Sequence, residues 1–343
     1  MKGRVVFKRL YPRNVFRISR AARAEVQNGY IEVNAEGVSG WGEASPNAYY
    51  GETAEQVEAQ LQAALPWLEG VRVESVEEIG ALWAESWRYL APSRAAQCAL
   101  NLALWDWLAR KQGISVAKLA LGHDAEPVRT FCTIGLSDAE ELGRKMAELR
   151  GFPLVKVKSD ARADFAPVRA VMANTGAAVA VDANAAWGAI DGAAVLREAE
   201  IAGVLFVEQP LAPSDDARLP QWRSGSALPI LADESCVSVG DVERMPGRFS
   251  GFNIKLVKCG GLTPALEMAR RGRELGLRTM VGCMLESSLL IAAGAVAAQL
   301  TDYADLDGAW LLREDPFAGL PLVRGVLRPG PGVGFGVEPV ETF

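Results

Sequence analysis

Residues 153–158 read Pro-Leu-Val-Lys-Val-Lys, and residues 177–182 read Ala-Ala-Val-Ala-Val-Asp. Each stretch is short, rich in valine and closed by a charged side chain, and its apolar body is typical of a buried parallel strand. Similar stretches recur at intervals of roughly 25 residues in the rest of the chain. The eight predicted strands are Val128–Ile134, Pro153–Lys158, Ala177–Asp182, Val204–Glu208, Pro229–Asp233, Gly251–Lys255, Arg278–Gly282 and Tyr303–Asp307.

Segments with a helical pattern lie between these strands, for example Asp191–Ala202 and Pro264–Leu275. Strands that alternate with helices indicate a parallel α/β sheet, which is either open and doubly wound or closed into a barrel. The two architectures share the same local pattern, but a total of eight strands favours a closed (β/α)₈-type barrel. We therefore predict the α/β class, with a TIM-like barrel over residues 123–317.

The first 122 residues have a different pattern. Strands are predicted at residues 2–10, 26–34 and 37–44, and three helices follow them, the first capped by Thr53. Strands followed by helices indicate an α+β unit, so we predict a separate N-terminal domain over residues 1–122. The glycine-rich segment over residues 318–343 is expected to return to this domain and complete it.

The composition excludes several classes of protein. The 343 residues include 36 Lys and Arg against 42 Asp and Glu, and the resulting charge of −6 argues against nucleic-acid binding. No apolar stretch is long enough to cross a membrane, and the N-terminus lacks a secretory signal. The single histidine, His123, excludes sites built on several histidines. Scattered cysteines predict reduced thiols in a cytoplasmic protein: Cys98, Cys132, Cys236, Cys259 and Cys283.

Three consecutive predicted barrel strands end in a carboxylate. These residues are Asp182, Glu208 and Asp233 on the third, fourth and fifth strands. The carboxyl ends of barrel strands form the active site of barrel enzymes, although any one such residue could simply cap a helix. Three carboxylates that meet at one barrel mouth require a cation, and oxygen ligands without His or Cys favour Mg²⁺ or Mn²⁺ over zinc. We predict that these three residues bind the metal.

Lysines end the predicted strands on either side of this group. Lys158 on the second strand and Lys255 on the sixth face each other across an eight-stranded barrel, and Lys156 shares a face with Lys158. Two opposed lysines beside a metal suit the removal of a C–H proton next to a carboxylate and the delivery of a proton to the other face. Such a base is expected to have a lowered pKa. The alternative is that both lysines only form ion pairs with the carboxylates.

The eighth predicted strand carries two aspartates. Asp305 and Asp307 are two residues apart, so their side chains lie on one face of a strand. Two carboxylates at the edge of the barrel mouth would bind an ammonium group. The alternative is a solvated loop or a pair that caps a helix.

The order of these motifs resembles the enolase superfamily, and more narrowly its muconate-lactonising subgroup. The motifs are Lys156-Val157-Lys158, Asp182-Ala183-Asn184, Val207-Glu208-Gln209-Pro210, Ala232-Asp233-Glu234-Ser235 and Asn253-Ile254-Lys255. The stretches Gly282–Ser287 and Asp305–Gly308 are similar to those of dipeptide epimerases of the L-Ala-D/L-Glu epimerase type. The resemblance extends over the whole chain and implies a (β/α)₇β barrel with an N-terminal α+β capping domain.

The resemblance also implies a role for each site residue. The substrate carboxylate would chelate the Mg²⁺ held by the three acidic residues, Lys158 and Lys255 would be the acid/base pair, and Lys156 would tune Lys158 and contact the carboxylate. Asp305 and Asp307 would hold the free ammonium group of a dipeptide. Further substrate contacts are implied at Thr133, Cys283 and Leu285.

Two lids from the capping domain are implied as well, near Ile18–Glu25 and Ser45–Thr53. Arg23 on the first lid is the preferred partner for a carboxylate in the substrate side chain, as in Glu. Arg20 lies on the same lid, and Arg23 could equally be a surface residue.

The predicted activity is a Mg-dependent dipeptide epimerase that inverts the α-carbon of the C-terminal residue by 1,1-proton transfer through an enediolate. The alternatives on the same scaffold are an o-succinylbenzoate synthase, an N-acylamino acid racemase and a cycloisomerase, whose substrates lack the ammonium group that paired aspartates would bind. The absence of a histidine base argues against relatives that resemble mandelate racemase. The alternative from another class is a barrel that binds a ligand or has a structural role without catalysing a reaction. The predicted partner is a small dipeptide, and a homo-oligomer remains open.

Overall fold

The computed structural model describes residues 1–330 and 332–340. Its N-terminal part begins with an antiparallel sheet in the order β1-β4-β5. These are the predicted strands: β1 (Lys2–Leu10), β4 (Val26–Ala35) and β5 (Val38–Ala44). The two residues that join β4 to β5, Glu36 and Gly37, have φ angles of 55° and 76°. Positive φ at both central residues of a two-residue turn suits the right-handed twist of a hairpin.

Two helices pack on this sheet, α1 (Ala54–Leu68) and α3 (Arg94–Lys111), and α2 (Val76–Leu90) and α4 (Val116–Leu121) pack against α3. The side chain of Thr53 accepts a hydrogen bond from the backbone N–H of Gln56 at 3.3 Å, and the side chain of Gln56 accepts one from the backbone N–H of Thr53 at 3.3 Å. Thr53 therefore caps α1 as predicted. Helix α3 is buried along most of its length and lies directly on β5. Gly40 and Gly42 permit this approach, because a Cβ at either position would collide with the α3 backbone.

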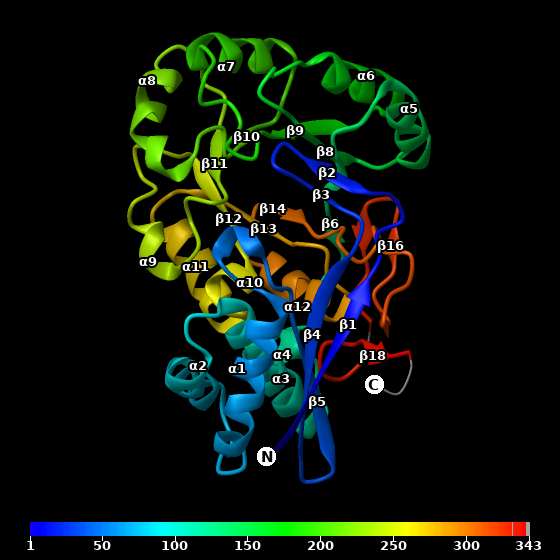
Figure 1. Ribbon diagram of the computed structural model, residues 1–343, viewed down its shortest axis with the longest axis vertical. Coiled ribbons are helices and arrows are strands. Elements are labelled where there is room, and N and C mark those ends of the chain that lie inside the picture. Colours follow the sequence, from blue (N-terminus) through cyan, green and yellow to red (C-terminus); the bar gives the residue numbers. More distant parts are fainter. Residues whose placement is uncertain (331, 341–343) are drawn as a thin grey trace.

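A small hairpin formed by β2 (Phe16–Ile18) and β3 (Ala21–Arg23) lies between β1 and β4 in the sequence. Its register places Phe16 opposite Arg23. In Figure 1 this hairpin reaches from the strands of the N-terminal part across the region of β8 and β9. The sequence predicts a loop near Ile18–Glu25, and the structure corrects it to a hairpin. Two strands of three residues are too short to give a readable alternation of apolar and polar side chains.

The rest of the chain forms the predicted barrel. Eight parallel strands follow one another in the order of the sequence, with at least one helix between each strand and the next. The strands are β7 (Cys132–Ile134), β8 (Leu154–Lys158), β9 (Ala178–Asp182), β10 (Val207–Glu208), β11 (Ile230–Ala232), β12 (Gly251–Lys255), β13 (Arg278–Gly282) and β14 (Tyr303–Asp305). The helices are α5 (Ala139–Glu148), α6 (Ala166–Thr175), α7 (Gly192–Ile201), α8 (Leu219–Arg223), α9 (Val239–Val242), α10 (Leu256–Cys259), α11 (Leu262–Glu274) and α12 (Ser288–Ala298), with the 3₁₀ turn η2 (Pro213–Arg218). Another 3₁₀ turn, η1 (Ala48–Tyr50), lies in the N-terminal part between β5 and α1. The predicted α/β class and TIM-like barrel are confirmed.

The barrel closes where its first strand meets its last. The backbone N–H of Phe131 donates to the carbonyl of Ala304 at 2.8 Å, and the Thr130 hydroxyl accepts from the backbone N–H of Leu306 at 2.7 Å. The predicted strand Val128–Ile134 is therefore two strands, because Thr130 leaves the ladder to make this contact. Its first part, β6 (Val128–Arg129), pairs outside the barrel with β17 (Val326–Leu327).

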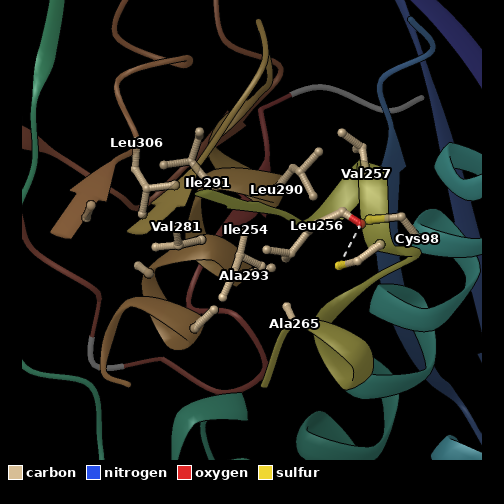
Figure 2. Packing of buried hydrophobic residues seen from close by; sticks show 14 of the residues in the cluster. Cys98, Ile254, Leu256, Val257, Ala265, Val281, Leu290, Ile291, Ala293 and Leu306 are labelled. Atoms are coloured by element: carbon tan, nitrogen blue, oxygen red, sulfur yellow. Dashed lines mark hydrogen bonds between the residues drawn. The ribbon is translucent and has the colours of Figure 1, made fainter. Parts of the chain in front are cut away.

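Apolar side chains fill both sides of the barrel wall. Inside, a separate buried cluster is formed by Phe131, Ala180, Phe206, Leu231 and Met280. Outside, Ile254 of β12 and Val281 of β13 pack toward Leu290 and Ile291 of α12, as Figure 2 shows. This packing holds the strands rigidly, so the side chains at their carboxyl ends have fixed positions.

The C-terminal segment contributes β15 (Phe317–Ala318), β16 (Leu322–Val323) and β18 (Glu338–Pro339). It lies against α3, since Asp106 accepts from the backbone of Phe335 at 2.9 Å and Arg110 donates to the carbonyl of Val337 at 2.9 Å. Residues 331 and 341–343 of the predicted segment lie outside the described residues, and the division of the chain at residue 122 stays a prediction. Within the described ranges, the search for membrane spans finds no helix of sufficient length and apolarity.

Candidate active site

Three carboxylates meet at the carboxyl ends of neighbouring barrel strands. Glu208 on β10 lies beside Asp182 on β9 in the register of the sheet, and Asp233 follows the last residue of β11. One oxygen from each lies within 4.8 Å of the others, and all three residues are buried. An all-oxygen ligand set with this spacing fits a hard divalent cation such as Mg²⁺.

Each of these carboxylates is hydrogen-bonded to a lysine. Lys158 donates to Asp182 at 2.5 Å, Lys255 donates to Asp233 at 2.9 Å, and Lys156 donates to Glu208 at 2.8 Å. The ion pairs that we considered as the alternative role of the lysines are therefore present. They do not exclude proton transfer, because both lysines also line the same pocket.

The carboxylates influence one another strongly. Burial raises the pKa of Glu208 to about 7, and the negative charge of Asp182 adds to this effect. Burial acts in the same direction on Asp233, but the charges of Lys255 and Lys258 outweigh it and hold its pKa below the ordinary value. Such closely spaced acids with opposed shifts are the electrostatic pattern expected where a cation binds.

The two predicted bases lie on opposite sides of this cluster. In the sheet order, three strands separate β8 from β12 in either direction around the barrel, so Lys158 and Lys255 face each other. Their side chains are only 8% and 9% exposed. Burial lowers the pKa of Lys255, but Asp233 and Glu208 outweigh burial and raise it overall. The lowered pKa that we predicted for a lysine beside a bound cation and a second ammonium group depends on that cation and stays a prediction.

Sequence reasoning missed two residues that support the carboxylates. Lys258 donates to the Asp233 side chain at 2.7 Å, and Asn253 donates to Glu208 at 2.6 Å. Asn253 was open to prediction, because it is two residues before Lys255 and therefore shares its face. Lys258 lies in α10, after the strand, and its sequence context gave no comparable signal.

The aspartate pair is buried at the opposite edge of the mouth. Asp305 accepts a hydrogen bond from Lys156, and Asp307 accepts one from the backbone N–H of Thr133 at 2.6 Å. Burial raises the pKa of Asp307 to about 7, and repulsion from Asp305 contributes. The alternative of a solvated loop is wrong, since both side chains face a common pocket.

A single pocket of about 380 Å³ joins these groups. It is lined by the catalytic candidates Lys156, Lys158 and Lys255 together with Asp233. All of the other predicted substrate contacts also line it: Arg23, Thr133, Cys283, Leu285, Asp305 and Asp307. The structure thus brings these residues from distant parts of the sequence to one cavity. The predicted metal ligands Asp182 and Glu208 are fully buried and do not line it themselves, but they accept hydrogen bonds from Lys158 and Lys156, which do. His123 is exposed and is not among the lining residues.

The β2–β3 hairpin covers this pocket and is fastened to the barrel. Arg17 accepts from the backbone N–H of Leu136 at 2.9 Å, and Arg20 forms a salt bridge of 2.5 Å with Glu234. The guanidinium group of Arg20 is thus already paired with a carboxylate of the protein. Arg23 donates to Asn47 at 3.2 Å and lines the pocket, and among the described residues no carboxylate pairs with it.

The capping part also holds a loop of the barrel. Glu43 accepts hydrogen bonds from the backbone N–H of Ser287 at 3.0 Å and from its hydroxyl at 2.5 Å. Asn28 donates to Glu43 at 2.8 Å and to the carbonyl of Leu285 at 3.0 Å. These buried bonds position the loop that carries Cys283 and Leu285 against the pocket.

The fold and the site define a member of the enolase superfamily. Residues 138–342 match the family model described as "Enolase C-terminal domain-like". Residues 2–122 match "Mandelate racemase / muconate lactonizing enzyme, N-terminal domain". The chain therefore belongs to the mandelate racemase and muconate lactonizing enzyme family, and the resemblance inferred from the motifs is confirmed.

Several of the similar proteins are named as dipeptide epimerases or described as homologous to them. An L-Ala-D/L-amino acid epimerase from Flavobacterium johnsoniae is 36% identical over 315 residues, which cover 92% of this chain and 93% of the relative. An enolase family member from Agrobacterium tumefaciens, solved with sodium and L-Ala-L-Glu, is 34% identical with a TM-score of 0.86, and the match covers 96% and 97% of the two chains. A dipeptide epimerase from Methylococcus capsulatus, solved with Mg and L-Arg-D-Lys, is 31% identical with a TM-score of 0.85, over 98% and 99% of the chains.

Proposed function

We propose that the protein is a Mg-dependent dipeptide epimerase that inverts the α-carbon of the C-terminal residue of its substrate. The observation that carries this proposal is the arrangement of Lys158 and Lys255 on opposite sides of one buried group of three carboxylates. A racemisation or epimerisation by two bases needs one group on each face of the reacting carbon. The sequence identity of 36% with an epimerase, over 92% of this chain, supports the same conclusion.

The lysines carry the proton transfer. One lysine, as the neutral amine, takes the α-proton of the bound substrate and becomes an ammonium group. The C–H bond electrons move into the carboxylate and give an enediolate that is planar at the α-carbon. The opposite lysine, present as an ammonium group, then donates a proton to the other face, so the number of protons is conserved. Lys158 and Lys255 exchange these roles for the reverse reaction.

The metal site supports the same chemistry. Asp182, Glu208 and Asp233 would hold Mg²⁺, or Mn²⁺ in its place, through one oxygen each. A divalent cation there would stabilise the negative charge that develops on the substrate carboxylate. Lys156 lies two residues before Lys158, is buried between Glu208 and Asp305, and is suited to contact that carboxylate.

The charges around the pocket indicate the substrate. Asp305 and Asp307 lie at one end, where they would bind the free ammonium group of a dipeptide. Arg23 lies on the hairpin and has no carboxylate partner among the described residues, so it suits an acidic side chain on the C-terminal residue. We therefore propose L-Ala-D/L-Glu-like dipeptides as substrates. The free state of all five cysteines supports a cytoplasmic location.

The test is epimerisation and exchange in D₂O. L-Ala-L-Glu should gain deuterium at the α-carbon of Glu and form L-Ala-D-Glu, as measured by mass spectrometry and chiral chromatography. Chelator should stop both processes and Mg²⁺ should restore them. Exchange on N-acylated amino acids but not on free dipeptides would instead favour an N-acylamino acid racemase. Full activity in exhaustive chelator would contradict the metal assignment.

A further inference from the structure

We propose that Leu311 sets the size limit for the N-terminal residue of the substrate, by closing the pocket off from a second cavity. This inference rests on the proposed function, because it assumes that the ammonium group of a dipeptide binds at Asp305 and Asp307. It names a specificity-determining residue and the class of dipeptide accepted: those with a small N-terminal residue.

The second cavity adjoins the first. It has a volume of about 40 Å³ and lies between the start of the β2–β3 hairpin, the loop after β7 and the segment after β14. Phe16, Thr133 and Leu311 line both cavities. These three side chains are therefore the partition between the pocket of about 380 Å³ and the smaller space behind it.

The partition lies next to the ammonium site. The backbone N–H of Thr133 donates to the Asp307 side chain at 2.6 Å. The backbone N–H of Leu311 donates to the carbonyl of Asp307 at 3.1 Å. In an α-amino acid the ammonium group and the side chain share one carbon. An ammonium group held by Asp307 therefore brings the N-terminal side chain within reach of Thr133 and Leu311.

Leu311 is the member of the partition that is best suited to truncation, because its hydrogen bonds are made by its backbone. Thr133 also donates its hydroxyl toward Asp305 at 3.4 Å, and Phe16 is paired with Arg23 in the hairpin. The Leu311 backbone is anchored at both ends, since its carbonyl accepts from the N–H of Arg13 at 2.7 Å. Truncation of its side chain would leave these anchors unchanged.

The second cavity suits an apolar side chain. Arg13 donates to the carbonyl of Leu312 at 3.0 Å and lies over the Trp310 ring at 5.5 Å. Lys145 is paired with Glu141 at 2.9 Å. Asn14 and Glu148 also line the cavity, but both are exposed, so their polar groups remain in contact with solvent. The rest of the lining presents mainly hydrocarbon: Pro12, Val15, Phe16, Leu149, Trp310 and Leu311. A Leu311→Ala substitution would join this space to the pocket and admit a leucine-sized side chain.

The experiment compares kcat/KM for L-Ala-L-Glu and L-Leu-L-Glu. The wild type should prefer L-Ala-L-Glu, and Leu311→Ala should shift the ratio toward L-Leu-L-Glu by at least about 10-fold, since one to a few methylenes in an apolar pocket change discrimination by roughly 10–200-fold. Leu311→Met, which conserves volume, should keep the preference of the wild type. Val15→Ala is the matched control, because Val15 lines the second cavity without belonging to the partition.

The outcomes separate this inference from the proposed function. An unchanged ratio in a folded Leu311→Ala variant that still epimerises L-Ala-L-Glu would overturn the role of Leu311 alone. An equal shift in Val15→Ala would also overturn it, because the partition would then not be the barrier. If the wild type incorporates no deuterium into any free dipeptide, the proposed function itself fails. Thermal melting of each variant checks that it is folded.

Discussion

Replacing Asp307 with Asn tests the ammonium site with little disturbance to the fold. Asp307 accepts a hydrogen bond of 2.6 Å from the backbone N–H of Thr133, and the amide oxygen of Asn is able to accept the same bond. The amide nitrogen would then face the substrate and present a donor where the ammonium group needs an acceptor. Asp305 is a poorer position for this test, because its replacement also disrupts the ion pair with buried Lys156.

The expected loss follows from the interaction removed. A charge-assisted hydrogen bond contributes roughly 1.5–3 kcal/mol, so kcat/KM for L-Ala-L-Glu should fall by about 10–150-fold in Asp307→Asn. The pH dependence should change as well. Because burial raises the pKa of Asp307 to about 7, its carboxylate forms as the pH rises through that value. The wild type should therefore gain affinity for the ammonium group over this range, and the variant should lack that gain.

The assay pairs two substrates with two proteins. N-acetylation of L-Ala-L-Glu removes the ammonium charge, so it should harm the wild type far more than the variant, in which the pairing is already weakened. The stabilisation of each protein by Mg²⁺ in thermal melting should be equal, since Asp307 is not among the clustered metal ligands. Equal wild-type activity on the free and the acetylated dipeptide would refute the ammonium role and favour the N-acylamino acid racemase alternative.

Two further predictions concern the lysines and a buried acid. Lys158→Ala and Lys255→Ala should each abolish epimerisation, and each should retain α-proton exchange in D₂O with only the one diastereomer that its remaining lysine reaches. Normal epimerisation by Lys255→Ala would contradict the two-base mechanism. Burial raises the pKa of Glu286 to about 8, with a contribution from Glu43, so its protonated form favours the folded state. The stabilising effect is complete below about pH 4.5 and is lost as the pH rises through 8. Chemical denaturation should show the wild type losing a few kcal/mol relative to Glu286→Gln over this range, at about 1.4 kcal/mol per pKa unit. Parallel pH profiles for the two proteins would contradict this prediction.

The barrel and its chemistry could be predicted because the signals are local. Each strand is a short apolar run, and the functional side chain comes at its end, so Lys158, Asp182 and Glu208 appear at the predicted positions. The parallel arrangement then places all strand ends at one mouth. No contact between distant residues had to be known for this inference, because a parallel barrel brings the side chains at its strand ends close together.

Other parts of the site depend on contacts that no local pattern reports. The hydrogen bond from Ser287 to Glu43 joins residues 244 positions apart, and the one from Asn28 to Leu285 spans 257 positions. Lys258 could not be assigned because its contacts with Asp233 depend on how α10 turns after β12. These residues have ordinary sequence contexts, and only the packing of the two parts of the chain gives them partners.

Under the proposed function, the two parts of the chain divide the recognition of a dipeptide between them. The barrel supplies the carboxylates, the opposed lysines and the aspartate pair, all on rigid strand ends. The hairpin supplies Arg23, and it is fastened to the barrel by the salt bridge between Arg20 and Glu234, the residue after Asp233 of the carboxylate group. A dipeptide with an acidic C-terminal residue carries charges at complementary places: an ammonium group for the barrel and a side-chain carboxylate for the hairpin. Changes in the hairpin should therefore alter which C-terminal residue is accepted, while the proton transfer, which depends on the barrel alone, remains the same.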